Sequence, residues 1–274
     1  MKQVKAYVVS NKRILPGGPH RAGRALASHL IQLHCPEIAG EAKPGQFVMV
    51  RCGDENVLPR PFSVHQVTKD DIFLFFAVLE GGKGSQWLSR RQDNEAVEAF
   101  GPLGNGFSIQ PRAKSLLLVA GGMGLAPLCF LAQQAVREKR SVTLLLGAAI
   151  GPLYTERPEN LLPPRIDLAT ATEDGSIGKK GRVTDLLPDF ADGADQIFAC
   201  GPMPMYRDMV LKKRKLKLEG KTVQISLEVR MGCGRGVCYG CIIKTKRGLK
   251  RVCEDGPVFD LDDILWDELT DGGV

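Results

Sequence analysis

The sequence predicts three domains: an antiparallel β-barrel over residues 1–111, a parallel-sheet α/β domain over residues 112–222, and a small C-terminal domain over residues 223–274. In the first part, short segments of alternating polar and apolar residues are separated by glycine and proline, which is typical of an antiparallel barrel or sandwich. From Ser115 onward, uninterrupted apolar runs alternate with helical segments, as in a parallel sheet buried on both faces. After Thr222 a cysteine-rich loop begins, and a module of about 50 residues holds little core without a bound metal.

The barrel is expected to contain six strands, over residues 1–14, 29–35, 46–52, 62–67, 72–79 and 95–100. Turn sequences such as Lys43-Pro44-Gly45 separate them. Between the first two strands, the segment Leu15–Ser28 (LPGGPHRAGRALAS) is rich in glycine and proline. We expect it to form a loop-like insertion.

The α/β domain is expected to contain four buried strands, within residues 115–122, 141–149, 165–175 and 195–202. The clearest helix is Pro127–Lys139, in which apolar residues recur every three or four positions. Near the C-terminus, the segment FDLDDILWDEL over residues 259–269 is expected to form a short closing helix.

The charge pattern argues against a nucleic-acid partner. The chain has 37 basic and 31 acidic residues and a net charge of +6, and its main basic run, Lys212–Lys217, is expected on the solvated end of a helix. The N-terminus lacks the apolar core of a signal peptide, and glycines and Pro127 interrupt the uncharged segment Ser115–Val136. We therefore expect a cytoplasmic protein without a membrane partner, in which clustered cysteines are metal ligands more often than disulfides.

A cysteine cluster provides the first chemical signal. Its ligands would be Cys233, Cys238, Cys241 and Cys253, with the spacing C-x4-C-x2-C-x11-C. This spacing is the plant-type [2Fe–2S] arrangement, whereas structural zinc usually uses two C-x2-C pairs, so zinc is the alternative. Four glycines in the loop allow it to wrap around an inorganic core and direct backbone N–H groups at the sulfurs; they are Gly232, Gly234, Gly236 and Gly240.

The motif RPFS, residues 60–63, is the second signal. On a barrel strand, the cation of Arg60 and the hydroxyl of Ser63 suit a flavin, which needs its pyrophosphate neutralised and its ring edge hydrogen-bonded. The sequence GGKGS at Gly81–Ser85 offers N–H groups and a hydroxyl to the same phosphates.

Two turns of the α/β domain predict a nicotinamide nucleotide site. The first, AGGMGLAP, supplies Gly121, Gly122 and Gly124 after a buried strand, although it lacks the full G-x-G-x-x-G pattern of a Rossmann dehydrogenase. The second, CGPMPMY, supplies three further candidates, Cys200, Gly201 and Pro202. Cys200 either contacts the nicotinamide or is a small buried residue at a strand end.

The choice between NAD and NADP depends on a short charged segment. Glu173 and Asp174 would favour the free 2′-hydroxyl of NAD, whereas Lys179, Lys180 and Arg182 would favour a phosphate. We expect NAD(H).

The order and spacing of RPFS, GGMGLAPL and CGPMPMY resemble the ferredoxin–NADP reductase superfamily over residues 1–220. With MGCGRGVCYGC and KRVCEDGPVFDLDDILW, the whole chain resembles the electron-transfer subunits of class 1B dihydroorotate dehydrogenases. The resemblance implies a [2Fe–2S] cluster on the four cysteines, NAD(H) as substrate, and a bound FAD. The implied FAD contacts are Arg60, Pro61, Phe62, Ser63, Ala77, Val78, Leu79, Gly84 and Ser85.

The resemblance further implies a partner, an FMN-containing dihydroorotate dehydrogenase catalytic subunit, in a heterotetramer with two copies of each chain. Electrons would pass from dihydroorotate through the partner's FMN to the cluster, FAD and NAD⁺ in pyrimidine biosynthesis. No catalytic residue for dihydroorotate is expected in this chain, because His20, His29, His34 and His65 form no metal or triad pattern. The alternatives are the small subunit of an NAD(P)H:ferredoxin-type oxidoreductase, a stand-alone reductase, and a zinc-containing binding module.

Overall fold

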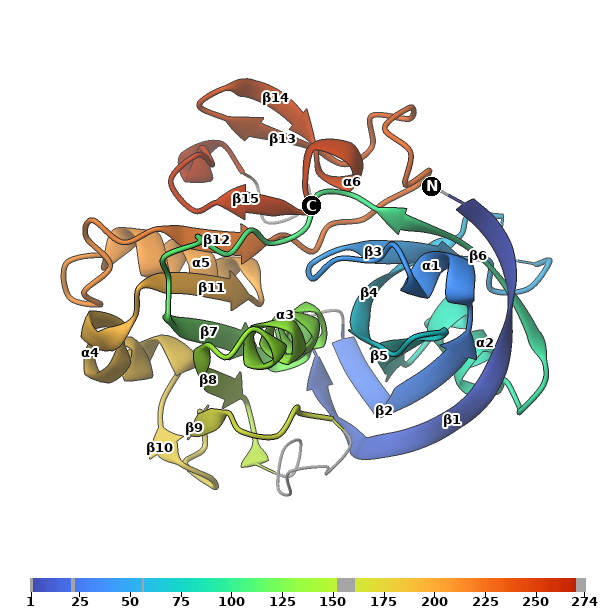
Figure 1. Ribbon diagram of the computed structural model, residues 1–274, viewed down its shortest axis with the longest axis horizontal. Coiled ribbons are helices and arrows are strands. Elements are labelled where there is room, and N and C mark those ends of the chain that lie inside the picture. Colours follow the sequence, from blue (N-terminus) through green and yellow to red (C-terminus); the bar gives the residue numbers. More distant parts are fainter. Residues whose placement is uncertain (1, 21–22, 56, 152–160, 270–274) are drawn as a thin grey trace.

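The computed structural model of the chain describes residues 2–20, 23–55, 57–151 and 161–269. It contains a closed six-stranded barrel, a seven-stranded sheet and a small C-terminal hairpin (Figure 1). The fold class predicted from the sequence is confirmed. Within the described ranges, we find no helix with the length and apolar character of a membrane span.

The barrel closes because β1 pairs with both β2 and β6. In spatial order its strands are β1 (Lys2–His20), β2 (Gly23–His34), β5 (Asp71–Leu79), β4 (Arg60–Val67), β3 (Phe47–Val50) and β6 (Ala96–Leu103). Alternate residues fill its interior, and Ile31, Leu33, Ile72 and Leu74 are fully buried there. The short helices α1 (Pro36–Ala39) and α2 (Lys83–Ser89) follow β2 and β5.

The segment Leu15–Ser28 is not a loop, so that prediction was wrong. Apart from residues 21 and 22, which lie outside the described residues, it forms the paired ends of β1 and β2, with Leu15 opposite Ser28. Leu15 is buried beside Leu30 and Phe75, which anchors the extension to the core. Its glycines and prolines resemble loop residues, but Gly17 lies where a Cβ would collide with the facing strand.

The central sheet is parallel except at one edge. In spatial order its strands are β10 (Lys179–Lys180), β9 (Asp167–Thr172), β8 (Ser141–Ala148), β7 (Ser115–Gly121), β11 (Gln196–Cys200), β12 (Val223–Ser226) and β15 (Val258–Asp260). Five consecutive residues of β7 are buried, as a strand covered on both faces requires. The chain runs outward from β7 to β10 and returns to β11, so the order of the strands reverses between β7 and β11.

Helices cover both faces of this sheet. Helix α3 (Leu125–Arg137) lies between the sheet and the barrel (Figure 1), and its buried side packs with Leu116 and Leu118 of β7. On the other face, Leu117 and Val119 pack with residues of α4 (Leu187–Phe190) and α5 (Met203–Leu211). The basic run Lys212–Lys217 therefore follows α5 instead of ending a helix, and three of its lysines pair with aspartates.

The expected closing helix is also absent from the described structure. Residues 258–260 form β15, which pairs antiparallel with β12, and only Trp266–Glu268 form a short 3-10 helix. Leu261, Ile264 and Trp266 are buried in the core although no α-helix contains them. Their spacing of two or three residues imitates helical periodicity in the sequence.

The segment of residues 231–241, which we call the cysteine loop, connects the central sheet to a hairpin. The hairpin consists of β13 (Ile242–Thr245) and β14 (Gly248–Arg251), and α6 (Val252–Asp255) follows it. The strands β12 and β15 belong to the central sheet although both lie beyond residue 222. The division into residues 1–111, 112–222 and 223–274 thus stays a prediction, and the last two parts share a sheet.

Candidate functional site

A cavity of about 220 Å³ opens between the barrel and the start of the C-terminal module; we call it the barrel cavity. Its wall contains five of the residues implied to contact FAD, namely Pro61, Phe62, Ser63, Ala77 and Leu79. They come from the adjacent strands β4 and β5, and Phe62 among them also packs against the buried residues of the barrel. Val78 points into the barrel core, so only its backbone is available to a ligand there.

The remaining residues implied for FAD lie together beside the strands. A Cβ on Gly84 would lie 2.8 Å from Cγ of Arg60, so the glycine makes room for the arginine side chain. The guanidinium of Arg60 donates to the carbonyl of Leu58 at 2.8 Å. The hydroxyl of Ser85 accepts from Leu79 N–H and donates to Gly82 O, each at 3.1 Å, and thereby fixes the start of α2. A phosphate contact from these residues stays a prediction.

A second cavity, of about 480 Å³, lies at the carboxyl ends of β7, β8, β9 and β11; we call it the sheet cavity. Ligands of parallel α/β sheets bind at this edge, where the order of the strands reverses. Gly121, Gly122 and Pro202 line it as expected. Gly121 and Gly201 lie in close contact, since a Cβ on Gly201 would come within 3.1 Å of Gly121 Cα.

Two predicted residues lie behind the wall of the sheet cavity. Cys200 is fully buried, and its thiol donates to the carbonyl of Ser226 at 3.5 Å. A Cβ on Gly124 would collide with the carbonyl of Cys200, so this glycine permits close packing of α3 against β11. Both residues therefore shape the site from beneath, and a direct nucleotide contact from either stays a prediction.

Glu228, which no sequence pattern indicated, lines both cavities. Its carboxylate lies 3.9 Å from the thiol of Cys200, which places a negative charge where the two cavities meet. Met123, between the predicted glycines, also lines both. Met123 could have been found from its place in the motif, but Glu228 follows β12 in an unremarkable sequence and becomes recognisable only in three dimensions.

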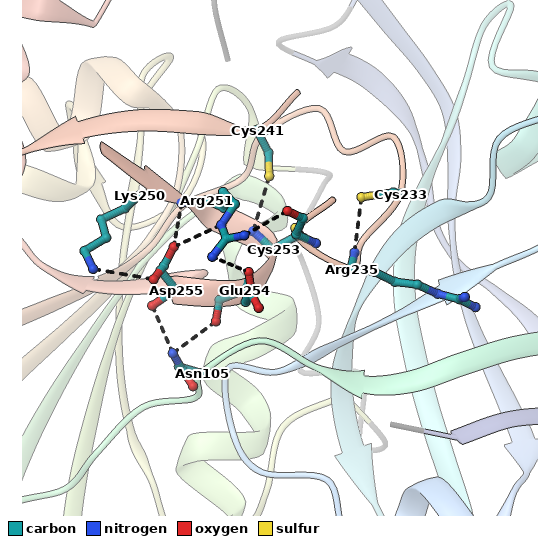
Figure 2. Close-up of polar contacts among 10 residues, drawn as sticks. Asn105, Cys233, Arg235, Cys241, Lys250, Arg251, Cys253, Glu254 and Asp255 are labelled. Carbon is teal, nitrogen blue, oxygen red and sulfur yellow. Dashed lines mark hydrogen bonds and ion pairs between the residues drawn. The ribbon is translucent and has the colours of Figure 1, made fainter. Parts of the chain in front are cut away.

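The four cysteines predicted as ligands lie around one loop and the turn of α6. Cys241 and Cys253 are buried, Cys233 is half-buried and Cys238 is exposed. Backbone N–H groups are directed at three of the sulfurs. Arg235 N–H points at Cys233 (3.3 Å) and Cys253 N–H at Cys241 (3.4 Å), as Figure 2 shows. Gly236 N–H points at Cys253 (3.2 Å). Such bonds stabilise thiolates and are a common feature of iron–sulfur sites.

The thiols differ in how easily they ionise. Burial raises the pKa of Cys233, but the N–H groups of Arg235 and Cys238 outweigh it and lower this pKa to about 6. Burial, with the neighbouring Cys241, raises the pKa of Cys253 to about 12. A buried thiol of this kind becomes a thiolate when a metal compensates the charge, so the donor set fits a metal centre.

The cysteine loop, residues 231–241, depends on its glycines. Gly234 and Gly236 have φ of +67° and +73°, and a Cβ on Gly234 would lie 2.6 Å from Met49 of the barrel. Among the described residues, no three His, Cys, Asp or Glu side chains are arranged as the ligands of one metal ion.

The barrel cavity and the cysteine loop are adjacent. Met231 lines the cavity and precedes Cys233 by only two residues. On the far side of the loop, Arg235 stacks over Phe100 of β6, with its charged carbon 4.4 Å from the ring centre. A ligand in the barrel cavity and a cluster on the cysteines would therefore be near neighbours, with the sheet cavity on the other side of Glu228.

Two family models match the chain. Residues 118–210 match the oxidoreductase NAD-binding domain, and residues 228–265 match the iron–sulfur cluster binding domain of dihydroorotate dehydrogenase B. The second range contains all four cysteines and Glu228.

Curated relatives match the chain over nearly its whole length. The dihydroorotate dehydrogenase B (NAD(+)) electron transfer subunit of Caldanaerobacter subterraneus subsp. tengcongensis is 33% identical and covers 96% of this chain and 99% of its own. The subunit of the same name from a Geobacillus species is 35% identical and covers 97% and 99%.

Solved structures share the fold. The NADH-dependent reduced ferredoxin-NADP oxidoreductase, solved in a study of flavin-based electron bifurcation, has a TM-score of 0.81 at 27% identity and covers 97% of this chain and 91% of its own. A ferredoxin NADP⁺ reductase from Neisseria gonorrhoeae, with bound FAD and NADP, has a TM-score of 0.59 at 17% identity and covers 81% and 93%.

Proposed function

Because the chain belongs to the electron transfer subunits of dihydroorotate dehydrogenase B, we propose that it passes electrons between NAD(H) and a catalytic dihydroorotate dehydrogenase subunit, through FAD and a [2Fe–2S] cluster. The observation that carries the proposal is the order of the sites. The sheet cavity and the barrel cavity share Met123 and Glu228 in their walls, and Met231 of the barrel cavity precedes Cys233 by two residues. The alternative of an NAD(P)H:ferredoxin-type oxidoreductase is weaker. This chain is 33–35% identical to the two dihydroorotate dehydrogenase B subunits, but only 27% identical to the ferredoxin-NADP oxidoreductase.

A nicotinamide carries two electrons as hydride and the cluster carries one, and bound FAD supplies the conversion between them. The residues of this chain bind and orient these groups. Pro61, Phe62 and Ser63 hold one side of the flavin site, and Gly121 and Pro202 admit the nucleotide. Glu228 places its carboxylate at the junction of the two cavities, where it would interact with charge on the nicotinamide or the flavin.

The partner supplies the chemistry on dihydroorotate. Within this proposal the catalytic subunit contains FMN, two copies of each chain assemble, and electrons flow toward NAD⁺, as the family resemblance implies. We also propose a cytoplasmic location. In support of it, all eight cysteines lie in the described ranges, and each is a thiol instead of half of a disulfide.

Anaerobic reconstitution of the full-length chain with iron, sulfide and FAD tests this function. We expect [2Fe–2S] absorption, and an EPR signal after reduction with NADH. Cys241→Ser should lose both cluster signals and keep the FAD, whereas the matched control Cys35→Ser, a buried cysteine of the barrel, should keep all three. A colourless chain with stoichiometric zinc, or FAD that NADH does not reduce, would contradict the proposal.

A further inference from the structure

We propose that Arg251 is a positioning residue of the cluster site, which holds Gly236 so that its N–H group points at the sulfur of Cys253. The inference rests on the proposed binding of a [2Fe–2S] cluster to the four cysteines. Arg251 ends β14, immediately before the helix α6 that contains Cys253, whereas Gly236 belongs to the separate cysteine loop. The spacing of the cysteines does not reveal this connection.

The guanidinium of Arg251 joins the two segments that contain the ligands (Figure 2). Its Nη1 donates to the carbonyl of Gly236 at 3.0 Å, and its Nη2 lies 2.6 Å from Oε2 of Glu254. Its charged carbon also lies 5.4 Å from the ring centre of Tyr239 in the loop. The planar fork of arginine makes these contacts together, whereas the single ammonium of lysine has no such geometry.

The base of this clamp is itself fixed. The backbone N–H of Arg251 donates to Oδ2 of Asp255 at 2.8 Å. Asn105, which follows the barrel strand β6, donates to the carbonyls of Glu254 and Asp255 at 3.2 and 3.0 Å (Figure 2). The barrel thus holds α6, and α6 holds Arg251 in place.

Gly236 passes the restraint to the ligand. Its carbonyl accepts from Arg251, and its N–H donates to the buried Sγ of Cys253 at 3.2 Å. Its φ of +73° is a conformation that glycine adopts readily, and a Cβ there would collide with the carboxylate of Glu254. Without the clamp, a glycine of this freedom would not keep its N–H on one sulfur.

This arrangement has a definite consequence for a bound cluster. Hydrogen bonds to the sulfurs and nearby charges set the reduction potential of iron–sulfur centres, and neighbouring residues also govern metal retention. Reduction adds negative charge, which both the Arg251 cation and the N–H···S bond stabilise. Loss of the clamp should therefore lower the potential and speed the loss of iron.

The test compares variants of the full-length chain loaded with cluster and FAD. Arg251→Gln should lower the reduction potential of the cluster, measured by EPR-monitored titration. It should also weaken the hyperfine coupling between the cluster and the exchangeable N–H proton of Gly236. Iron loss to a chelator should become about tenfold faster. Arg251→Lys should lower the potential and the coupling as well, although it keeps the charge. The matched control, Arg247→Gln in the same hairpin, should match wild type because this exposed arginine pairs with Asp263 instead.

Glu254→Gln separates position from charge. Removal of a negative charge alone would raise the potential and leave the proton coupling unchanged, whereas release of Arg251 should weaken the coupling. Wild-type proton coupling in both Arg251→Lys and Glu254→Gln would overturn the positioning role. These two variants decide the question even if Arg251→Gln fails to fold and binds no FAD. A wild-type chain that takes up FAD but no cluster would instead overturn the proposed function, and this inference with it.

Discussion

Two carboxylates follow strand β9, and they have different surroundings. Glu173 lines the sheet cavity together with Arg182. The carboxylate of Asp174 accepts hydrogen bonds from the hydroxyl and the N–H of Ser176, at 2.6 and 3.0 Å, and these bonds lower its pKa. Of the charged residues that could select between NAD and NADP, Glu173 and Arg182 line the cavity. Glu173 would repel the 2′-phosphate of NADP, and Arg182 would attract it.

Replacement of Glu173 should change the nucleotide preference. We expect Glu173→Gln to raise kcat/KM for NADPH relative to NADH about tenfold, which corresponds to about 1.4 kcal/mol from relief of like-charge repulsion. Steady-state reduction of an artificial acceptor with each nucleotide measures the ratio. Asp174→Asn is the matched control and should leave it within a factor of two or so. An unchanged ratio in Glu173→Gln would show that another residue selects NAD.

Motifs define some single residues of the site in the sequence. The fold places the four spaced cysteines around one loop and α6, and it places Pro61, Phe62 and Ser63 of RPFS along one cavity; their roles as ligands stay predictions. Glu228 lies in no such motif, and the motif that contains Arg251 (KRVCEDGPVFDLDDILW) predicts no role for this side chain, because both residues act on segments that meet only after folding. Cys200 shows the converse: the sequence left two roles open, and the fold buries the side chain.

At the scale of elements, a buried histidine joins the barrel to the sheet domain. His65 of β4 is fully buried, and its ring nitrogens each lie 3.1 Å from a carbonyl oxygen, of Ala126 in α3 and of Leu161. Burial lowers the pKa of His65 to about 4, against the opposing effect of the two carbonyls. The neutral imidazole is therefore the form that the folded chain keeps near neutral pH.

The stability of the chain should therefore fall in mild acid. Between pH 6.5 and about 4 the unfolded chain binds a proton at His65 that the folded chain does not, so the free energy of unfolding decreases as the pH falls through this window. The full effect of His65 is about 3 kcal/mol. Urea titrations of wild type and His65→Gln at several pH values measure it. The variant should be less stable at pH 7, but its free energy of unfolding should decrease less as the pH falls. An equal pH dependence in wild type and variant would show that His65 does not cause the loss of stability.

The elements themselves were mostly predictable from periodicity. The buried runs around β7, β8, β9 and β11 and the helix α3 were expected close to where they occur. The extension of β1 and β2 was not, because Pro16, Gly17 and Gly18 resemble loop residues, and the strand pairing that keeps them extended is nonlocal. β15 was mistaken for part of a helix for the same reason, since its pairing with β12 is invisible in the sequence.

At the scale of the whole molecule, the C-terminal module that contains the cysteines shares one hydrophobic core with the barrel and the central sheet. Ile243 and Cys253 belong to the same buried cluster as Met49 of the barrel and Val119 of the sheet. A module of this size gains little from its own interior, so its stability depends on these shared contacts. We expect the three parts to unfold together.

A cavity in the shared core should therefore affect both cofactors. We expect Ile243→Ala to reduce the free energy of unfolding by about 2–4 kcal/mol, because the side chain is buried and the space cannot close fully. In a thermal melt, flavin fluorescence and cluster absorbance should shift to lower temperature by the same amount. Leu249→Ala, on the exposed side of the same hairpin, is the control. Loss of the cluster signal alone would indicate an independently unfolding module.

The antiparallel strand β15 also sets an order of events during synthesis. Strand β12 pairs on one side with β11, which precedes it in the chain, but its other edge stays open until residues 258–260 have left the ribosome. The segment made in the meantime contains all four cysteines. Cys241 and Cys253, which are buried in the folded chain, are thus synthesised before or together with the last strand of the sheet, and they become enclosed only when β15 completes it.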